Sequence, residues 1–158
     1  TKATAAAGGR DPKLLGNLVE EALRYETPTA GMWRIVKQDT ELGGVAIPAG
    51  AVVQLRYAAA NRDPRRWDDP SAFQLNRPKI KEHVAFGRGK HVCAGAPLAR
   101  VEVRVILEKF FEYTTNIDLD EAKHGPRGNR NFDFEPSFII RGLSDLHIKL
   151  TPAAGFKP

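Results

Sequence analysis

The segment from Phe86 to Gly95 constrains this chain more than any other part of its sequence. It reads Phe-Gly-Arg-Gly-Lys-His-Val-Cys-Ala-Gly and contains Cys93, the only cysteine among 158 residues. Glycines at positions 87, 89 and 95 let the backbone turn tightly and approach a flat ligand without interference from Cβ atoms. The segment is therefore predicted to form a tight loop that presents a single sulfur atom.

Three roles for Cys93 are open from the residues around it. A lone cysteine excludes an intrachain disulfide, a Cys-x-x-Cys redox pair and a four-cysteine zinc site. Most lone cysteines are inert, buried residues, which is the first role. His91 stands two residues away and could activate a nucleophilic thiolate, which is the second. The third is that of an axial ligand to a haem iron.

A long amphipathic helix is predicted directly after this loop, over residues 96–113. Pro97 suits its first turn, because the N–H that proline lacks has no intrahelical partner there. Apolar residues recur three and four positions apart, opposite a polar stripe that includes Arg100 and Arg104. Cys93 therefore lies at the amino end of a helix, where free N–H groups and the helix dipole favour a thiolate.

Three blocks of this sequence resemble one family in the same order. The pattern Phe-Gly-x-Gly-x-His-x-Cys-x-Gly resembles the haem-binding loop of the cytochrome P-450 haem-thiolate monooxygenases, and residues 86–95 match every specified position. Residues 21–24 resemble the family's Glu-x-x-Arg helix. The run Asn61-Arg62-Asp63-Pro64, with Trp67, Pro70, Phe73 and Arg77 after it, resembles the meander that precedes the haem loop. The residues of these blocks are most similar to those of the soluble bacterial branch of the family.

The resemblance implies an α+β fold class, as the C-terminal part of the mainly α cytochrome P-450 fold. Residues 1–10 would be a flexible lead-in, and residues 11–158 the haem-binding proximal part. We expect helices over 12–26 and 96–113, strands near 33–38, 45–47 and 51–57, an irregular stretch over 63–82, and a C-terminal hairpin that joins 138–142 with 146–150.

The resemblance also implies roles for individual residues. Cys93 would be the axial ligand of the iron in haem b (iron-protoporphyrin IX), and His91 and Arg34 would hold its propionates. The implied cofactor-binding set is Arg34, Phe86, Gly87, His91, Cys93 and Gly95. A possible substrate pocket would include Met32, Trp33, Ile139 and Ile140.

Glu21 and Arg24 stand three residues apart on one helix. This spacing alone predicts a solvated surface pair, worth well under about 1 kcal/mol. The resemblance instead implies a buried structural triad of Glu21, Arg24 and Arg77 that ties the helix to the meander. Arg62 is the competing candidate for the third position. The remaining histidines, His83, His124 and His147, carry no motif and are expected to be surface or hydrogen-bonded residues.

For the intact parent, the resemblance implies a monooxygenase that inserts one atom of O2 into a small apolar organic substrate. The thiolate would favour O–O cleavage. No catalytic residue is expected within this chain, because the family's oxygen-activating acid–alcohol pair precedes the Glu-x-x-Arg helix. We therefore expect the chain alone to be inactive. The alternative is a truncated, stand-alone structural or interaction domain that binds haem weakly or not at all.

The net charge of +5 comes from 24 Lys and Arg against 19 Asp and Glu, interleaved along the chain, so nucleic acid is not an expected partner. Four cations lie on the Cys93 loop and the following helix: Arg88, Lys90, Arg100 and Arg104. They form a possible redox-partner face, on which a ferredoxin or flavoprotein reductase would dock as electron donor. A charged helix stripe can equally be a solvated face.

No stretch approaches the roughly 20 apolar residues of a membrane span, and no signal peptide is visible. A cytoplasmic location without membrane contact is expected.

Overall fold

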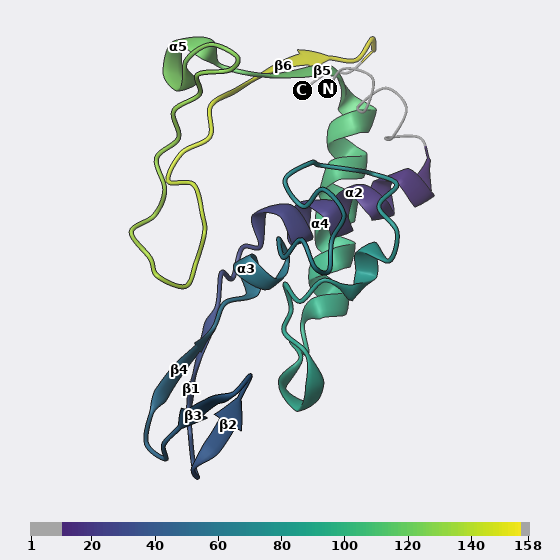
Figure 1. Ribbon diagram of the computed structural model, residues 1–158. Coiled ribbons are helices and arrows are strands. Elements are labelled where there is room, and N and C mark those ends of the chain that lie inside the picture. Colours follow the sequence, from purple (N-terminus) through teal and green to yellow (C-terminus); the bar gives the residue numbers. More distant parts are fainter. Residues whose placement is uncertain (1–10, 156–158) are drawn as a thin grey trace.

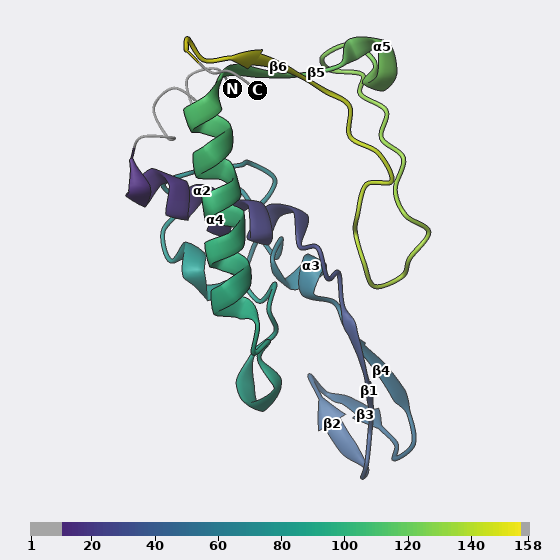
Figure 2. The same ribbon diagram turned by 180° about the vertical axis from the view of Figure 1, so that it is seen from behind.

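Two long helices cross near the middle of the molecule, and small antiparallel sheets lie at its two ends (Figures 1 and 2). The computed structural model describes residues 11–155. The helices are α2 (Pro12–Glu26) and α4 (Ala96–Tyr113), with the bounds that the sequence predicts. The expected flexible lead-in falls on residues 1–10 and lies outside the described residues.

Local signals at both ends fix the bounds of α2. The Asp11 side chain caps the first turn by accepting hydrogen bonds from the N–H groups of Lys13 (2.8 Å) and Leu14 (3.4 Å). At the other end Thr27 adopts a left-handed conformation (φ 42°), and its hydroxyl donates to the carbonyl oxygen of Arg24 at 2.8 Å. Because Thr27 is fully buried, the end of the helix is held inside the structure.

Two antiparallel strand pairs follow α2 and extend away from the helices, one of them lying between the two strands of the other along the chain. Strand β1 (Met32–Ile35) pairs with β4 (Val52–Leu55), and β2 (Thr40–Leu42) pairs with β3 (Val45–Ile47) across the Gly43-Gly44 turn. The predicted strands near 33–38, 45–47 and 51–57 are present, but the first ends already at Ile35, and the last ends at Leu55 because the chain turns into α3 (Tyr57–Ala60). Strand β2 carries no period-two pattern, which is why the sequence did not indicate it.

Residues 61–95 wrap around α2 with little regular structure, and the part before the Cys93 loop, residues 61–85, is called the wrapping segment below. Residues 61–95 contain the short 3-10 helices η1 (Ile80–Glu82) and η2 (Gly89–His91) and lead directly into α4. The buried apolar core of the described chain is small and lies where this segment meets α2 and α4; its members are Leu15, Val19, Trp67, Ile80, Ala85 and Ala96.

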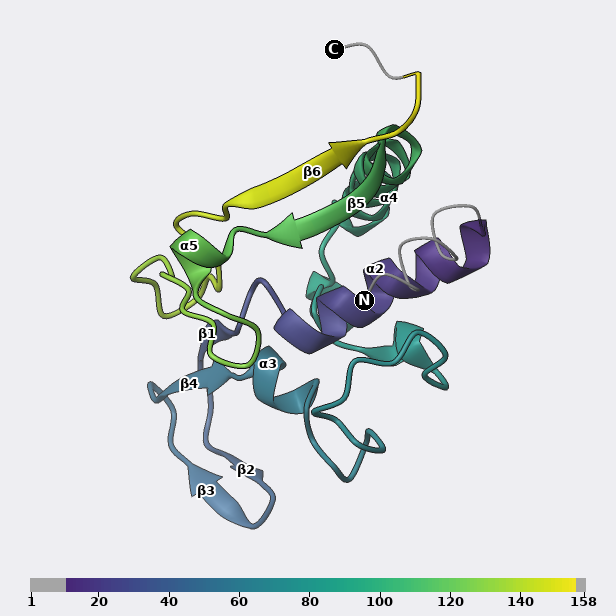
Figure 3. The same cartoon turned by 90° about the horizontal axis from the view of Figure 1, so that it is seen from above.

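The third sheet begins at the end of α4, as the view from above shows (Figure 3). Strand β5 (Thr114–Leu119) pairs with β6 (Ile148–Pro152), and the short helix α5 (Glu121–His124) and a long loop connect them. The predicted pairing of residues 138–142 with 146–150 is wrong. Leu150 pairs with Ile117 instead, since β5 offers a full six-residue partner, and Ile140 forms an isolated bridge with Thr29.

Several apolar side chains of α4 remain exposed in the described structure, including Leu98 (62%) and Ile106 (54%). The predicted helix is present, but α2 covers only part of its apolar face. Within residues 11–155, no helix combines the length and the apolar character that crossing a membrane requires.

Candidate functional site

A buried cluster of charged side chains joins α2 to the segment around residues 68–77. The Glu21 carboxylate accepts hydrogen bonds from Arg24 (2.8 Å from both Nε and Nη2), from Arg77 Nε (3.1 Å) and from the backbone N–H of Gln74 (2.8 Å). Burial raises the pKa of the Glu21 carboxyl, but the hydrogen bonds from Arg24, Gln74 and Arg77 outweigh burial and lower this pKa. The carboxylate therefore stays ionised between two guanidinium groups.

Arg24 uses all five of its N–H donors in this cluster. Beside its two bonds to Glu21, it donates to the carbonyl oxygens of Asn61 (2.9 Å), Pro70 (3.0 Å) and Ala72 (3.1 Å). The solvated pair that spacing alone predicts is wrong, because the wrapping segment leaves both Arg24 and Glu21 with no exposed surface. The planar fork of arginine matches this set of acceptors, which lysine could not satisfy.

Arg77, and not Arg62, is the arginine that the structure brings to Glu21. Arg62 lies on the outer side of α2, where it donates to the Tyr25 carbonyl oxygen and its guanidinium lies 4.4 Å from the centre of the Tyr25 ring. The Arg77 side chain also donates to three carbonyl oxygens between residues 68 and 72. It therefore fixes the wrapping segment as well as the carboxylate.

The loop that carries Cys93 is built on left-handed glycines. Gly87 and Gly89 have φ angles of 72° and 78°, a conformation that residues with a Cβ rarely adopt. The N–H of Cys93 donates to the carbonyl oxygen of Phe86 at 2.9 Å, which closes the loop. Cys93 itself is exposed, and the Gly95 backbone passes close to its sulfur, since a Cβ there would lie 3.8 Å from Sγ.

A cavity of about 360 Å³ lies beside this loop, between it and the start of β1. One wall carries Cys93 and His91, and Arg34 reaches the cavity from β1. The rest of the lining is mostly apolar: Leu23, Pro28, Thr29, Met32, Tyr57, Ala85 and Phe86. An apolar space with one thiol and two potential cations fits a flat apolar macrocycle that carries an iron and two carboxylates.

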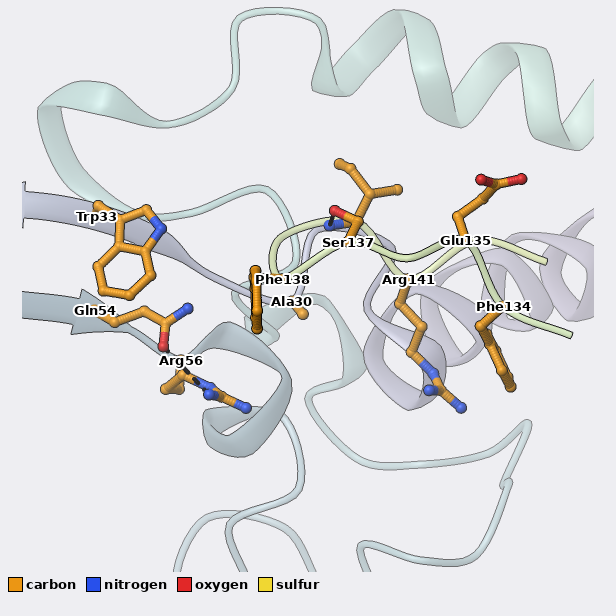
Figure 4. A pocket seen from close by; sticks show the side chains of 10 residues that line it. Ala30, Trp33, Gln54, Arg56, Phe134, Glu135, Ser137, Phe138 and Arg141 are labelled. Atoms are coloured by element: carbon orange, nitrogen blue, oxygen red, sulfur yellow. Dashed lines mark hydrogen bonds between the residues drawn. The ribbon is translucent and has the colours of Figure 1, made fainter. Parts of the chain in front are cut away.

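The residues expected to line a substrate pocket do not share one cavity. Met32 lines the Cys93 cavity, whereas Trp33 and Ile140 line a second cavity of about 330 Å³. Figure 4 shows this second cavity, with the Trp33 indole beside Gln54 and the ring of Phe138 nearby. Side chains alternate between the two faces of a strand, so consecutive residues of β1 point to opposite sides. Ile139 accepts a hydrogen bond from the N–H of Ala30 through its carbonyl oxygen (2.7 Å).

A second buried carboxylate, Glu20, has no counterpart among the sequence predictions. Arg100 Nε donates to Glu20 Oε1 at 2.7 Å, and Arg100 Nη2 to Oε2 at 3.1 Å, while His83 Nε2 lies 2.8 Å from Oε2. Burial raises the pKa of the Glu20 carboxyl, but the bonds from His83 and Arg100 prevail and lower it to about 2. Its only sequence signal is a second acid directly before Glu21, so sequence reasoning missed this network.

The other predicted cations of the Cys93 face are arranged differently from Arg100. Arg88 and Lys90 are exposed on the loop, and Arg104 lies 3.7 Å from Glu108 on the surface of α4. Within the described residues, no three His, Cys, Asp or Glu side chains gather to form a metal site.

Comparisons with known proteins point to one family. The family model described as Cytochrome P450 matches residues 11–120. Cytochrome P450 144 of Mycobacterium tuberculosis is 44% identical over 138 residues, which are 87% of this chain and 30% of that protein. The beta-dihydromenaquinone-9 omega-hydroxylase of Mycobacterium bovis is 38% identical over 143 residues, or 90% of this chain and 27% of that protein.

The same relationship holds in three dimensions. The substrate-free structure of Mycobacterium marinum cytochrome P450 CYP150A6 matches with a TM-score of 0.88 and 44% identity, over 97% of this chain and 40% of that chain. The predicted fold class is thus confirmed as the C-terminal part of the mainly α fold of these proteins. This chain spans between 27% and 40% of the length of the three relatives.

Proposed function

The chain belongs to the cytochrome P450 family, and we propose that Cys93 is the axial thiolate ligand of its haem. Haem is the cofactor that the family implies. The observation that carries the proposal is the cavity in which Cys93, His91 and Arg34 face a mostly apolar space. When bound there, haem b supplies an iron that exchanges electrons and binds O2.

The residues of this chain would hold the cofactor from one side. His91 from η2 and Arg34 from β1 line the cavity and would bind the two propionates. Phe86 lines the cavity, while Gly87 and Gly95 would let the backbone of the loop approach the cofactor. Glu21, Arg24 and Arg77 would act at a distance by fixing the wrapping segment beneath the loop.

We propose that the whole protein is a monooxygenase that inserts one atom of O2 into a small apolar organic substrate. One relative is named an omega-hydroxylase, and hydroxylation belongs to this class of reaction. Met32, on the Cys93 cavity, is the predicted pocket residue best placed to meet such a substrate. Trp33, Ile139 and Ile140 would act only from the second cavity or the segment beside it.

Bacterial members of the family generally use redox partners and O2. We propose that a ferredoxin or flavoprotein reductase docks on the Cys93 side, at Arg88, Lys90 and Arg104. Exposed cations of this kind speed the encounter with an acidic partner and make its rate depend on salt. Reversing the charge of Arg88 and Arg104 should therefore slow reduction and flatten its salt dependence; unchanged rates would exclude docking there.

A spectrum tests the proposed ligand directly. Haem is added to the protein, the sample is reduced with dithionite and exposed to carbon monoxide, and the Soret band is recorded. We expect a red-shifted thiolate-type band that is absent in Cys93→Ser and retained in Ala94→Ser, which places the same hydroxyl one residue away. If wild type takes up no haem, or if Cys93→Ser keeps the band, the proposal is wrong.

A further inference from the structure

The Glu20 carboxylate contacts both ends of the loop that carries Cys93. His83 precedes the loop and Arg100 follows it on the first turns of α4, and both bind the same carboxylate. Glu20 and His83 are 6% and 7% exposed. A single buried group on α2 therefore joins the two stems of the loop.

From these stems the contacts converge on residues 85 and 86. The N–H of Ala85 donates to His83 Nδ1 at 3.2 Å, and the Arg100 guanidinium lies 4.6 Å from the centre of the Phe86 ring. The Phe86 carbonyl oxygen in turn accepts the N–H of Cys93. A shift of His83 or Arg100 can therefore reach Cys93 through Ala85 and Phe86.

The hydrogen-bond partners also assign the proton on His83. Since Nδ1 accepts from a backbone N–H, the proton lies on Nε2 and is donated to Glu20. Arg100 supplies the guanidinium that balances the negative charge of Glu20. Buried networks of this kind, with each polar group satisfied, hold one arrangement rigidly.

We propose that Glu20, His83 and Arg100 are positioning residues that hold the Cys93 loop so that its thiolate stays bound to the haem iron. This inference rests on the proposed haem ligation by Cys93. It also takes Arg100 out of the docking face, because its guanidinium is bound in a bidentate manner and its charge is balanced by a buried carboxylate.

Arg100→Lys separates positioning from docking, because it keeps the positive charge and removes the planar fork. Glu20→Gln removes the charge at nearly constant shape. Leu15→Ala serves as the control: Leu15 is a buried residue of the same helix, and its truncation lowers stability by creating a cavity.

The variants are made in the protein expressed from its whole coding sequence and loaded with haem. The measurement is the rate at which the thiolate-type band of the ferrous carbon monoxide complex is lost in mild urea. We expect Arg100→Lys and Glu20→Gln to lose it about tenfold faster than wild type, because each breaks a hydrogen bond to a charged group. Leu15→Ala should lose it no faster than its lowered thermal midpoint accounts for.

Equal rates for Arg100→Lys and for Leu15→Ala at matched thermal midpoints would overturn the proposal, since the network would then be merely structural. A wild-type protein whose spectrum equals that of Cys93→Ser would overturn the haem ligation instead. Positioning is then still measured by the amide exchange of Cys93 without haem. Faster exchange in Arg100→Lys than in Leu15→Ala supports it, and equal exchange overturns it.

Discussion

Replacing Arg24 by lysine tests how much of the fold depends on the fork of one buried arginine. The five N–H donors of Arg24 meet five acceptors, at distances from 2.8 to 3.1 Å. Lysine keeps the charge but has three donors. At least two of the five hydrogen bonds of Arg24 are therefore lost.

The structure sets the size of the expected effect. A hydrogen bond to a charged group contributes about 1.5–3 kcal/mol. The Ala72 carbonyl keeps its bond from Arg77 (2.7 Å), and the Pro70 carbonyl lies in a partly buried contact that water can reach, so some of what is lost is replaced. Two such losses amount to about 2–4 kcal/mol in the free energy of unfolding, a large share of the 5–15 kcal/mol or so that is usual for a domain.

Urea denaturation followed by circular dichroism measures this difference. Arg141→Lys is the matched control, because Arg141 also binds a glutamate, Glu26, at 2.7 Å, but with both side chains 43–50% exposed. Its loss should stay below about 1 kcal/mol. If Arg24→Lys costs no more than Arg141→Lys, the argument from donor geometry is refuted.

Three further predictions concern other parts of the chain. Acid should destabilise wild type more steeply than Glu20→Gln between about pH 4.5 and pH 2, as measured by circular dichroism. The pKa of Glu20 falls from 4.5 to about 2 on folding. The stability that its ionised form contributes is therefore complete above pH 4.5 and is lost as the pH falls through 2. Parallel acid curves would contradict this. Gly31→Ala should lower the thermal midpoint by crowding the Leu55 carbonyl oxygen (2.5 Å from the added Cβ), whereas Gly16→Ala, with nothing within 4 Å, should raise it through helix propensity. His124→Phe should speed amide exchange at His147, whose N–H donates to His124 Nε2 at 2.8 Å; unchanged exchange would show that this bond is unimportant.

The sequence predicts the two long helices well because their ends are marked locally. Asp11 caps α2, Thr27-Pro28 ends it, and Pro97 stands in the first turn of α4. Strand β5 has no such mark: it begins at Thr114 directly after α4, without glycine or proline, and pairs with a strand about thirty residues later. Its partner is therefore decided by tertiary contacts, which the local pattern does not contain.

The candidate site also has one part that the sequence predicts and another that only the folded chain reveals. The Cys93 loop is visible in the sequence, because glycines and a lone cysteine follow one another at short spacing. The alternation of Met32 and Trp33 between two cavities is a consequence of strand orientation that needs the pairing of β1 with β4. The bonds from Glu20 to His83 and Arg100 span 63 and 80 residues, so they appear only when the chain is folded.

The adjacency of Glu20 and Glu21 limits how the chain can change in length. Consecutive helical residues are turned by about 100° from each other. Here the Glu20 carboxylate binds the two stems of the Cys93 loop, while the Glu21 carboxylate binds Arg77 of the wrapping segment. A deletion between Glu21 and Arg24 would rotate the acids away from both sets of partners at once. Insertions and deletions should instead collect in hairpin turns such as that at Gly43-Gly44, where no side chain bridges distant segments.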